Sequence, residues 1–153
     1  MKLAPVQTPA LMKCLPIVKL PALGLLFLVV ALAGCSTISS YDQAAYSQVI
    51  SAKVDALSLM SKAAGPYESH RKDIEAVTLE MDKAYEYEKG RALNQITVRQ
   101  WEILRDPERD LLGGFLKRWK EKGSLKPFFI EEKKKQVSDA FDQIIQLEGK
   151  KIR

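Results

Sequence analysis

The chain has 153 residues and a formal net charge of +5, from 24 lysine and arginine residues against 19 aspartate and glutamate residues. Three of the lysines lie in residues 1–34, which hold no acidic residue, so the remaining 119 residues carry a net charge of only about +2. That length is enough for one domain with a modest core, and so balanced a charge does not support nucleic-acid binding.

An uncharged apolar run occupies residues 20–34, and Lys13 and Lys19 precede it. Its 15 residues fit the hydrophobic region of a secretory signal peptide and fall short of the roughly 20 residues that a membrane-spanning helix needs. The run closes with Leu32-Ala33-Gly34-Cys35. This stretch resembles the lipobox of bacterial lipoproteins, whose signal peptide is cleaved directly before a cysteine that receives lipid. An uncleaved N-terminal anchor helix is the alternative.

The resemblance implies that residues 1–34 are a signal peptide, that Cys35 carries the lipid and that residues 35–40 are a lipidated tether. Translation from Met12 instead of the first methionine gives a signal peptide of ordinary length. By the same resemblance, Ser36 implies sorting to the bacterial outer membrane, with the domain facing the periplasm. The only other cysteine leaves with the signal peptide, so we expect no disulfide.

The first predicted helix begins near Tyr41, because apolar residues then recur at every third or fourth position. Ser40 directly precedes this pattern and is the expected N-cap. Gly65 and Pro66 end the helix, because proline lacks the backbone N–H and disfavours helical geometry in the residue before it.

The second helical pattern covers residues 67–105, which contain no proline and one glycine, Gly90. A single glycine costs a helix only about 1 kcal/mol, so we expect one long continuous helix. A break between residues 90 and 94, with Asn94 as the N-cap of a separate helix, is the alternative.

The third predicted helix starts at Asp106 and Pro107, because aspartate is a good N-cap and proline fits the first helical position. Gly123 is the expected C-cap that ends it. Gly113 and Gly114 lie within this helix and lack side chains, so we expect a neighbouring helix to approach the backbone there.

The last helical pattern runs from residue 127 to residue 149, and its apolar stripe includes Phe128 and Ile130. No segment alternates polar and apolar residues with an enrichment in β-branched side chains. The sequence therefore predicts an all-α domain over residues 41–153, an antiparallel helical bundle of three to four helices with one long helix and no β-sheet.

The sequence lacks the residue patterns of an enzyme or a metal centre. Its one histidine, His70, stands beside basic residues, which is typical of a surface position. No spacing of cysteine and histidine fits a zinc site, and neither a glycine-rich phosphate loop nor a Gly-x-Ser-x-Gly element occurs. We therefore expect no enzymatic activity, no cofactor and no metal ion.

The charges beyond the predicted signal peptide are unevenly spread, at −3 over residues 35–108 and +5 over residues 109–153. The asymmetry is a reason to expect contact between the C-terminal part and an anionic surface or acidic partner, and a solvated helix face is the plainer interpretation. The residues that carry the excess are Lys117, Arg118, Lys120, Lys122, Lys133, Lys134 and Lys135.

Aromatic residues on the predicted helices offer a second indication of contacts. Trp119 continues the apolar row of Phe115, so we expect it to be buried. Tyr87 and Trp101 lie off the apolar stripe of the long helix, and we expect them to be exposed to a partner.

Two functional interpretations compete. The first is an envelope lipoprotein, held to the membrane by lipid on Cys35, whose helical domain binds a protein partner or forms a homo-oligomer. The second is a ligand-binding lipoprotein that holds an apolar or anionic molecule between its helices. An outer spanin of phage lysis is a third and weaker interpretation. Oligomers or partners favour the first interpretation, and a monomer with an internal cavity favours the second.

Overall fold

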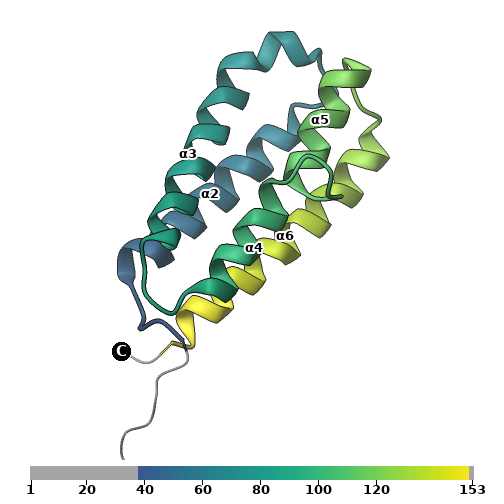
Figure 1. Cartoon of the computed structure of the whole chain (residues 1–153). Coiled ribbons are helices and arrows are strands. Elements are labelled where there is room, and N and C mark those ends of the chain that lie inside the picture. Colours follow the sequence, from purple (N-terminus) through teal and green to yellow (C-terminus); the bar gives the residue numbers. More distant parts are fainter. Residues whose placement is uncertain (1–37, 152–153) are drawn as a thin grey trace, which may run out of the picture. The chain divides into compact units, whose positions relative to one another are not determined.

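The structure is a computed structural model that describes residues 38–151, which belong to one compact unit. The regular secondary structure of these residues is entirely helical, which confirms the all-α prediction (Figure 1). The predicted signal peptide, Cys35 and Ser36 lie outside the described residues. The elements are α2 (Gln43–Ser61), the 3₁₀ turn η1 (Tyr67–His70), α3 (Arg71–Lys89), α4 (Gln95–Arg105), α5 (Leu112–Lys122) and α6 (Pro127–Gly149).

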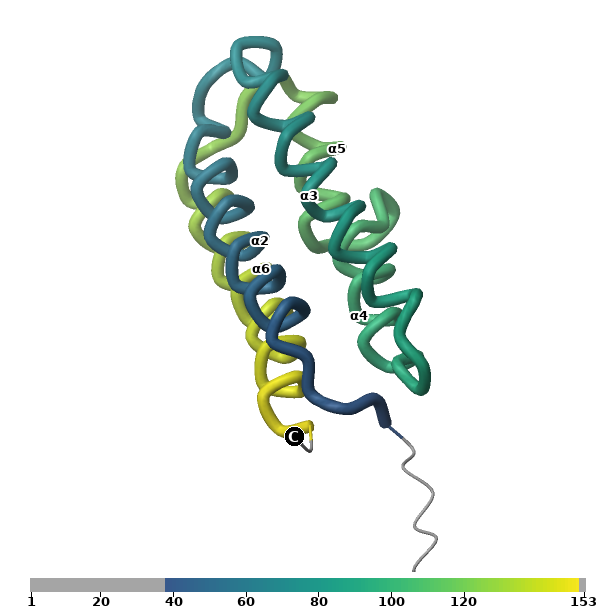
Figure 2. The backbone as a smooth tube through the Cα atoms, turned by 90° about the vertical axis from the view of Figure 1, so that its left-hand side faces the viewer, coloured from purple at the N-terminus to yellow at the C-terminus, as the bar shows by residue number. Residues whose placement is uncertain are grey.

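The helices lie side by side along one direction (Figures 1 and 2). α2 packs against α3 and α6, and α4 packs against the same two helices. One end of the domain, here called the tether end, holds the first described residues, the α3–α4 connection and the end of α6. At the opposite, distal end, the Leu125 N–H donates to the Ala63 carbonyl at 2.8 Å and joins the α2–α3 connection to the α5–α6 turn.

α2 begins two residues later than predicted. Its N-cap is Asp42, whose Oδ1 accepts a hydrogen bond from the Ala45 N–H at 2.9 Å. Ser40, the predicted N-cap, has a different partner, since its carbonyl accepts from the Arg91 guanidinium at 2.6 Å. The Asp42 cap therefore sets the start of α2, and the α3–α4 connection holds Ser40 through Arg91.

The expectation of one long helix over residues 67–105 is wrong, and the alternative with a break is correct. α3 ends at Lys89 and α4 starts at Gln95, with Asn94 in the N-cap position. Between them, Leu93 has φ of +58°, a left-handed conformation that costs a leucine about 1 kcal/mol. The Asn94 side chain donates to the Glu88 carbonyl at 3.0 Å and so closes the turn instead of capping α4.

The third predicted helix starts later than its capping residues indicate. Asp106 accepts a hydrogen bond from the Glu108 N–H at 2.8 Å and thereby caps a turn, and α5 begins only at Leu112. A Cβ on Gly113 would overlap the Arg105 carbonyl oxygen. Arg105 is the last residue of α4, so the close approach at this glycine comes from a neighbouring helix, as expected.

The core is built around two tryptophans. Trp119 is fully buried, as predicted, and its indole N–H donates to the Gly65 carbonyl at 3.0 Å. Trp101 is also fully buried, so the expectation that it is exposed is wrong. Its ring packs edge-on against Phe141 at 6.0 Å. The break before α4 changes which face of this helix meets the core, and the stripe of a continuous helix therefore misplaced Trp101.

Candidate functional site

Phe128 is the most exposed of the large apolar side chains among residues 38–151, with an exposed fraction of 82%. The sequence assigned it to the apolar stripe of α6, and this assignment is wrong. Ile130 is buried in the core, and at 3.6 residues per turn Phe128 lies about 200° around the helix from it. The first turn of α6 therefore directs an aromatic ring outward at the distal end.

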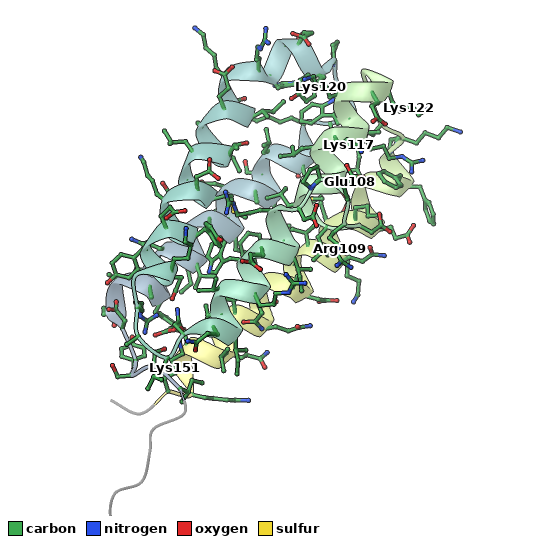
Figure 3. All side chains as sticks on the ribbon, viewed as in Figure 1. Glu108, Arg109, Lys117, Lys120, Lys122 and Lys151 are labelled. Atoms are coloured by element: carbon green, nitrogen blue, oxygen red, sulfur yellow. The ribbon has the colours of Figure 1, made fainter. Side chains whose placement is uncertain are left out.

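Two hollows lie at the turn between α5 and α6, which precedes Phe128 in the chain. The smaller hollow, of about 250 Å³, lies toward η1, and Tyr67, Lys120 and Lys122 are among its lining residues. Figure 3 shows Lys120 and Lys122 at this end of α5. The larger hollow, of about 400 Å³, is lined by Arg118, Lys122, Ser124, Leu125, Lys126 and Phe129.

Four of the seven cations that the sequence indicated are paired with carboxylates. Lys133 is only 6% exposed, so it does not add to an open surface. The hydrogen bond to Glu108 raises the pKa of Lys117 and engages this ammonium group as well (Figure 3). The four pairs are Lys117–Glu108 at 2.6 Å, Lys133–Asp110 at 2.7 Å, Lys134–Glu131 at 3.3 Å and Lys135–Asp139 at 2.9 Å.

Four cations, three of them among those seven, have no carboxylate partner among residues 38–151, and they lie in α5 and in the turn that leads to the exposed Phe128. We call this group, Arg118, Lys120, Lys122 and Lys126 together with Phe128, the distal basic surface. Within residues 117–126 there are five basic residues and one acidic residue, so the local charge is strongly positive. The Arg118 guanidinium lies 4.5 Å from the centre of the Phe129 ring, a cation–π contact that leaves its charge uncompensated.

A buried cluster of charged side chains lies at the tether end. Glu148 accepts hydrogen bonds from Arg91, at 2.9 Å, and from Lys151. Glu88 accepts from the same arginine at 2.8 Å, and Lys151 donates to Asn94 at 2.8 Å. We call these five residues the tether network, and Figure 3 shows Lys151 at this end. Two carboxylates face two cations, so the network is electrically balanced.

The tether network holds the beginning of the described chain. The Ser39 hydroxyl donates to Asn94 at 2.8 Å, and the Asp42 N–H donates to Glu148 at 2.8 Å. Ser39 is buried, so the folded part starts inside the predicted tether of residues 35–40. Sequence reasoning missed the network because its two halves, residues 88–94 and 148–151, lie more than 50 positions apart. The only local signal was opposite charge three residues apart, at Glu88 with Arg91 and at Glu148 with Lys151.

The pKa of Glu148 lies below its ordinary value of 4.5. Burial raises this pKa, but the hydrogen bonds from Arg91 and Lys151 together with the Asp42 N–H outweigh burial and lower it. The carboxylate is thus ionised at neutral pH, where it balances the two cations of the network.

We expect acid to weaken the fold through Glu148. Because its folded pKa is lower than its unfolded pKa, the ionised form stabilises the domain fully above about pH 4.5, and this contribution is lost as the pH falls through the lowered value. Urea unfolding measured from neutral pH down to about pH 3 should show this decline. A Glu148→Gln variant should show a shallower decline, and an equal slope in both proteins would contradict the assignment to Glu148.

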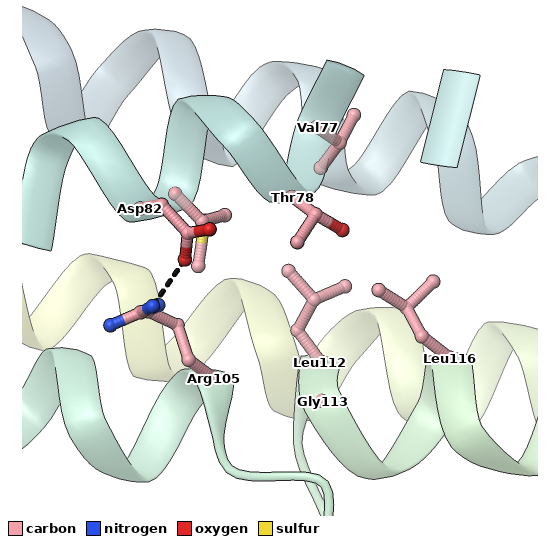
Figure 4. A pocket seen from close by; sticks show the side chains of 8 residues that line it. Val77, Thr78, Asp82, Arg105, Leu112, Gly113 and Leu116 are labelled. Atoms are coloured by element: carbon pink, nitrogen blue, oxygen red, sulfur yellow. Dashed lines mark hydrogen bonds and ion pairs between the residues drawn. The ribbon is translucent and has the colours of Figure 1, made fainter. Parts of the chain in front are cut away.

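A groove between α3 and α5 is the third candidate site, after the distal basic surface and the tether network. It has a volume of about 190 Å³ (Figure 4). An ion pair between Arg105 and Asp82 closes one end, and the same guanidinium lies 4.3 Å from the centre of the Tyr85 ring. The groove therefore offers a small apolar volume with no unpaired charge. Its other lining residues are Val77, Thr78, Met81, Leu112, Gly113 and Leu116.

Comparisons with protein-family models, with curated proteins and with solved structures find no match to this chain. No helix within residues 38–151 is long and apolar enough to cross a membrane. The same residues contain no group of three or more His, Cys, Asp or Glu side chains placed to hold a metal ion. His70 lies beside Trp119, with ring centres 5.7 Å apart, and 3.6 Å from the Asp73 carboxylate.

Proposed function

We propose that this protein is a lipid-anchored bacterial envelope protein that binds an acidic protein partner through the distal basic surface. In this proposal Cys35 carries the lipid, the helical domain is an antiparallel bundle in the periplasm, and the bundle holds the partner away from the outer membrane. The observation that carries the proposal is the exposed Phe128 ring at the start of α6, together with the cations without carboxylate partners in α5 and the preceding turn, at the end of the domain opposite to the tether.

The composition of the distal basic surface suits a protein interface. Interfaces typically combine a central aromatic or arginine anchor with a polar rim, and rim charges steer the encounter of complementary surfaces. Phe128 supplies the apolar anchor, and the hollows at the α5–α6 turn supply concave surface at the same end of the domain. The surrounding cations select for an acidic partner.

The length of the domain argues against the lipids of its own membrane as the binding partner of this surface. α6 has 23 residues and spans roughly 34 Å between the two ends. Electrostatic attraction is screened over about 8 Å at physiological salt. An upright domain tethered at residue 38 therefore places the distal basic surface beyond the reach of the anionic headgroups next to its anchor.

The test is photo-crosslinking of the full chain in intact bacterial cells, with a photoreactive phenylalanine analogue at position 128. We expect one discrete crosslinked acidic protein, and we expect high salt in isolated envelopes to reduce the yield. A variant with Arg118, Lys120, Lys122 and Lys126 changed to Gln should lose most of the crosslink, while its stability changes by only tenths of a kcal/mol because these side chains are solvated.

The matched control carries the analogue at Val54, an exposed apolar residue in the middle of α2. Equal crosslinking from positions 54 and 128 would contradict a specific surface. A crosslink to a second copy of this chain would replace the acidic partner with a homo-oligomer. Crosslinks to lipid alone would show that the surface meets a membrane.

The groove beside Arg105 supports the second interpretation, a ligand-binding lipoprotein, less well. Small-molecule sites typically occupy about 300–1,000 Å³, and this groove has about 190 Å³. Its one cation is already paired with Asp82, so an anionic ligand would first have to break that ion pair.

A further inference from the structure

We propose that the tether end of the domain lies on the bilayer that holds its lipid, with the side chains of Leu93 and Ile96 seated in the interfacial region of that bilayer. This inference rests on the proposed lipid attachment at Cys35. It concerns the end of the domain opposite to the distal basic surface, and its occupant is the lipid surface itself.

Several large apolar side chains are exposed at the tether end. Leu93 in the α3–α4 connection is 47% exposed, and Ile96 in the first turn of α4 is 59% exposed. Tyr87 in the last turn of α3 is 37% exposed, and its hydroxyl donates to Asp42 at 2.9 Å. Two aliphatic side chains and a tyrosine at the same end of a domain are a combination suited to a membrane interface.

The backbone at Leu93 strengthens this argument. Its φ of +58° lies in the region that glycine and asparagine adopt easily and leucine does not. The half-exposed side chain gains little from packing, so neither the local conformation nor the core accounts for a leucine at this turn. A contact outside the domain accounts for it.

The path of the chain places the lipid close to these residues. The Ser39 N–H donates to the Leu93 carbonyl at 2.9 Å, so the chain enters the folded part beside Leu93. Four Cα–Cα steps of about 3.8 Å separate Cys35 from Ser39, which limits their distance to roughly 15 Å. A lipid on Cys35 thus keeps Leu93 within reach of the membrane surface.

The tether network fixes the first described residues of the chain to the folded domain. Ser39 is held by Asn94, the Ser40 carbonyl by Arg91 and the Asp42 N–H by Glu148. Because Asn94 and Glu148 are buried, the distance between lipid and domain stays short while the network is intact. The domain then meets the bilayer with the connection that carries Leu93.

The test uses the full chain, purified from bacterial membranes as the acylated protein and reconstituted into phospholipid vesicles. A single cysteine at position 93 or 96 carries an environment-sensitive fluorophore, since Cys35 is blocked by its lipid. We expect blue-shifted emission, quenching by nitroxide-labelled lipids and protection from aqueous iodide. Matched controls at Val54 and Leu79, exposed apolar residues in the middle of α2 and α3, should be quenched by iodide and not by the lipids.

Leu93→Asn separates membrane contact from folding. Asparagine tolerates the left-handed backbone, so the unfolding midpoint should stay the same or rise, while lipid quenching of a label at position 96 should fall. Iodide quenching at positions 93 and 96 of the acylated protein would overturn the membrane contact alone. Shielding from both quenchers would assign this surface to a protein instead. A protein without acyl chains by mass spectrometry would overturn the lipid anchor and this inference together.

Discussion

Replacing Trp119 with alanine is expected to lower the free energy of unfolding by about 3–5 kcal/mol, the usual cost of removing a large buried aromatic side chain. Trp119 is fully buried, and its ring packs edge-on against Tyr67 at 5.5 Å. Its indole N–H also joins α5 to the Gly65 carbonyl at 3.0 Å. The substitution therefore leaves a cavity and also releases the connection between α2 and α3.

Urea unfolding followed by far-ultraviolet circular dichroism measures this effect. Trp119→Phe keeps much of the apolar area and loses the hydrogen bond, so its cost should lie between those of the alanine variant and the unchanged protein. Lys120→Gln changes the next residue, which is exposed, and should cost only tenths of a kcal/mol. A loss of less than about 1 kcal/mol for Trp119→Ala would contradict the central position of this ring.

The second large effect is expected at Glu148, where replacement by glutamine should cost about 3–5 kcal/mol. The glutamine side chain has nearly the same shape and can still accept from the Asp42 N–H. What it removes is the negative charge between Arg91 and Lys151, whose side chains are 12% and 0% exposed. Removing one partner from a buried ion network leaves the opposite charge uncompensated, which is more costly than the loss of a surface pair.

Glu131→Gln is the matched control, because this residue lies in the same helix, pairs with Lys134 and is 71% exposed. We expect it to change stability by no more than about 0.5 kcal/mol. In the Glu148→Gln protein, amide hydrogen exchange should also accelerate at Ser39 and Asp42, since the network holds both residues. Equal stabilities of the two variants would show that the buried charge has no structural role.

The two large effects concern opposite ends of the domain. Trp119 supports the distal end, where the proposed partner binds, and Glu148 supports the tether end, where the chain enters. Variants of the distal basic surface should therefore lose binding without loss of stability. Variants of the tether network should lose stability first, and their loss of binding should follow from unfolding.

The helical class of this protein was determined by the sequence alone. Apolar residues at every third or fourth position can be buried together only on a helix, and this local rule needs no knowledge of the partner helices. The helix ends that have a purely local cause could also be predicted from the sequence. Gly123, with φ of +73°, ends α5, and Pro127 occupies the first turn of α6, because both conformations depend on the residue itself.

The tertiary structure alone decided the features that depend on distant residues. The chain turns at Leu93 because Asn94 binds Glu88 and because Ser39, from far along the chain, binds the Leu93 carbonyl. This turn also directs Trp101 into the core, which the stripe of an unbroken helix did not predict.

The same distinction applies to the charged residues. In sequence Lys133, Glu148 and Lys151 look like surface charges, and each is buried because a partner from another part of the chain or a nearby turn compensates it. Conversely, Phe128 looks like a core residue and is exposed, because the register of α6 directs Ile130 inward. Local periodicity determines that a helix forms, whereas the packing of that helix against others decides which of its side chains meet solvent, a partner or a buried ion.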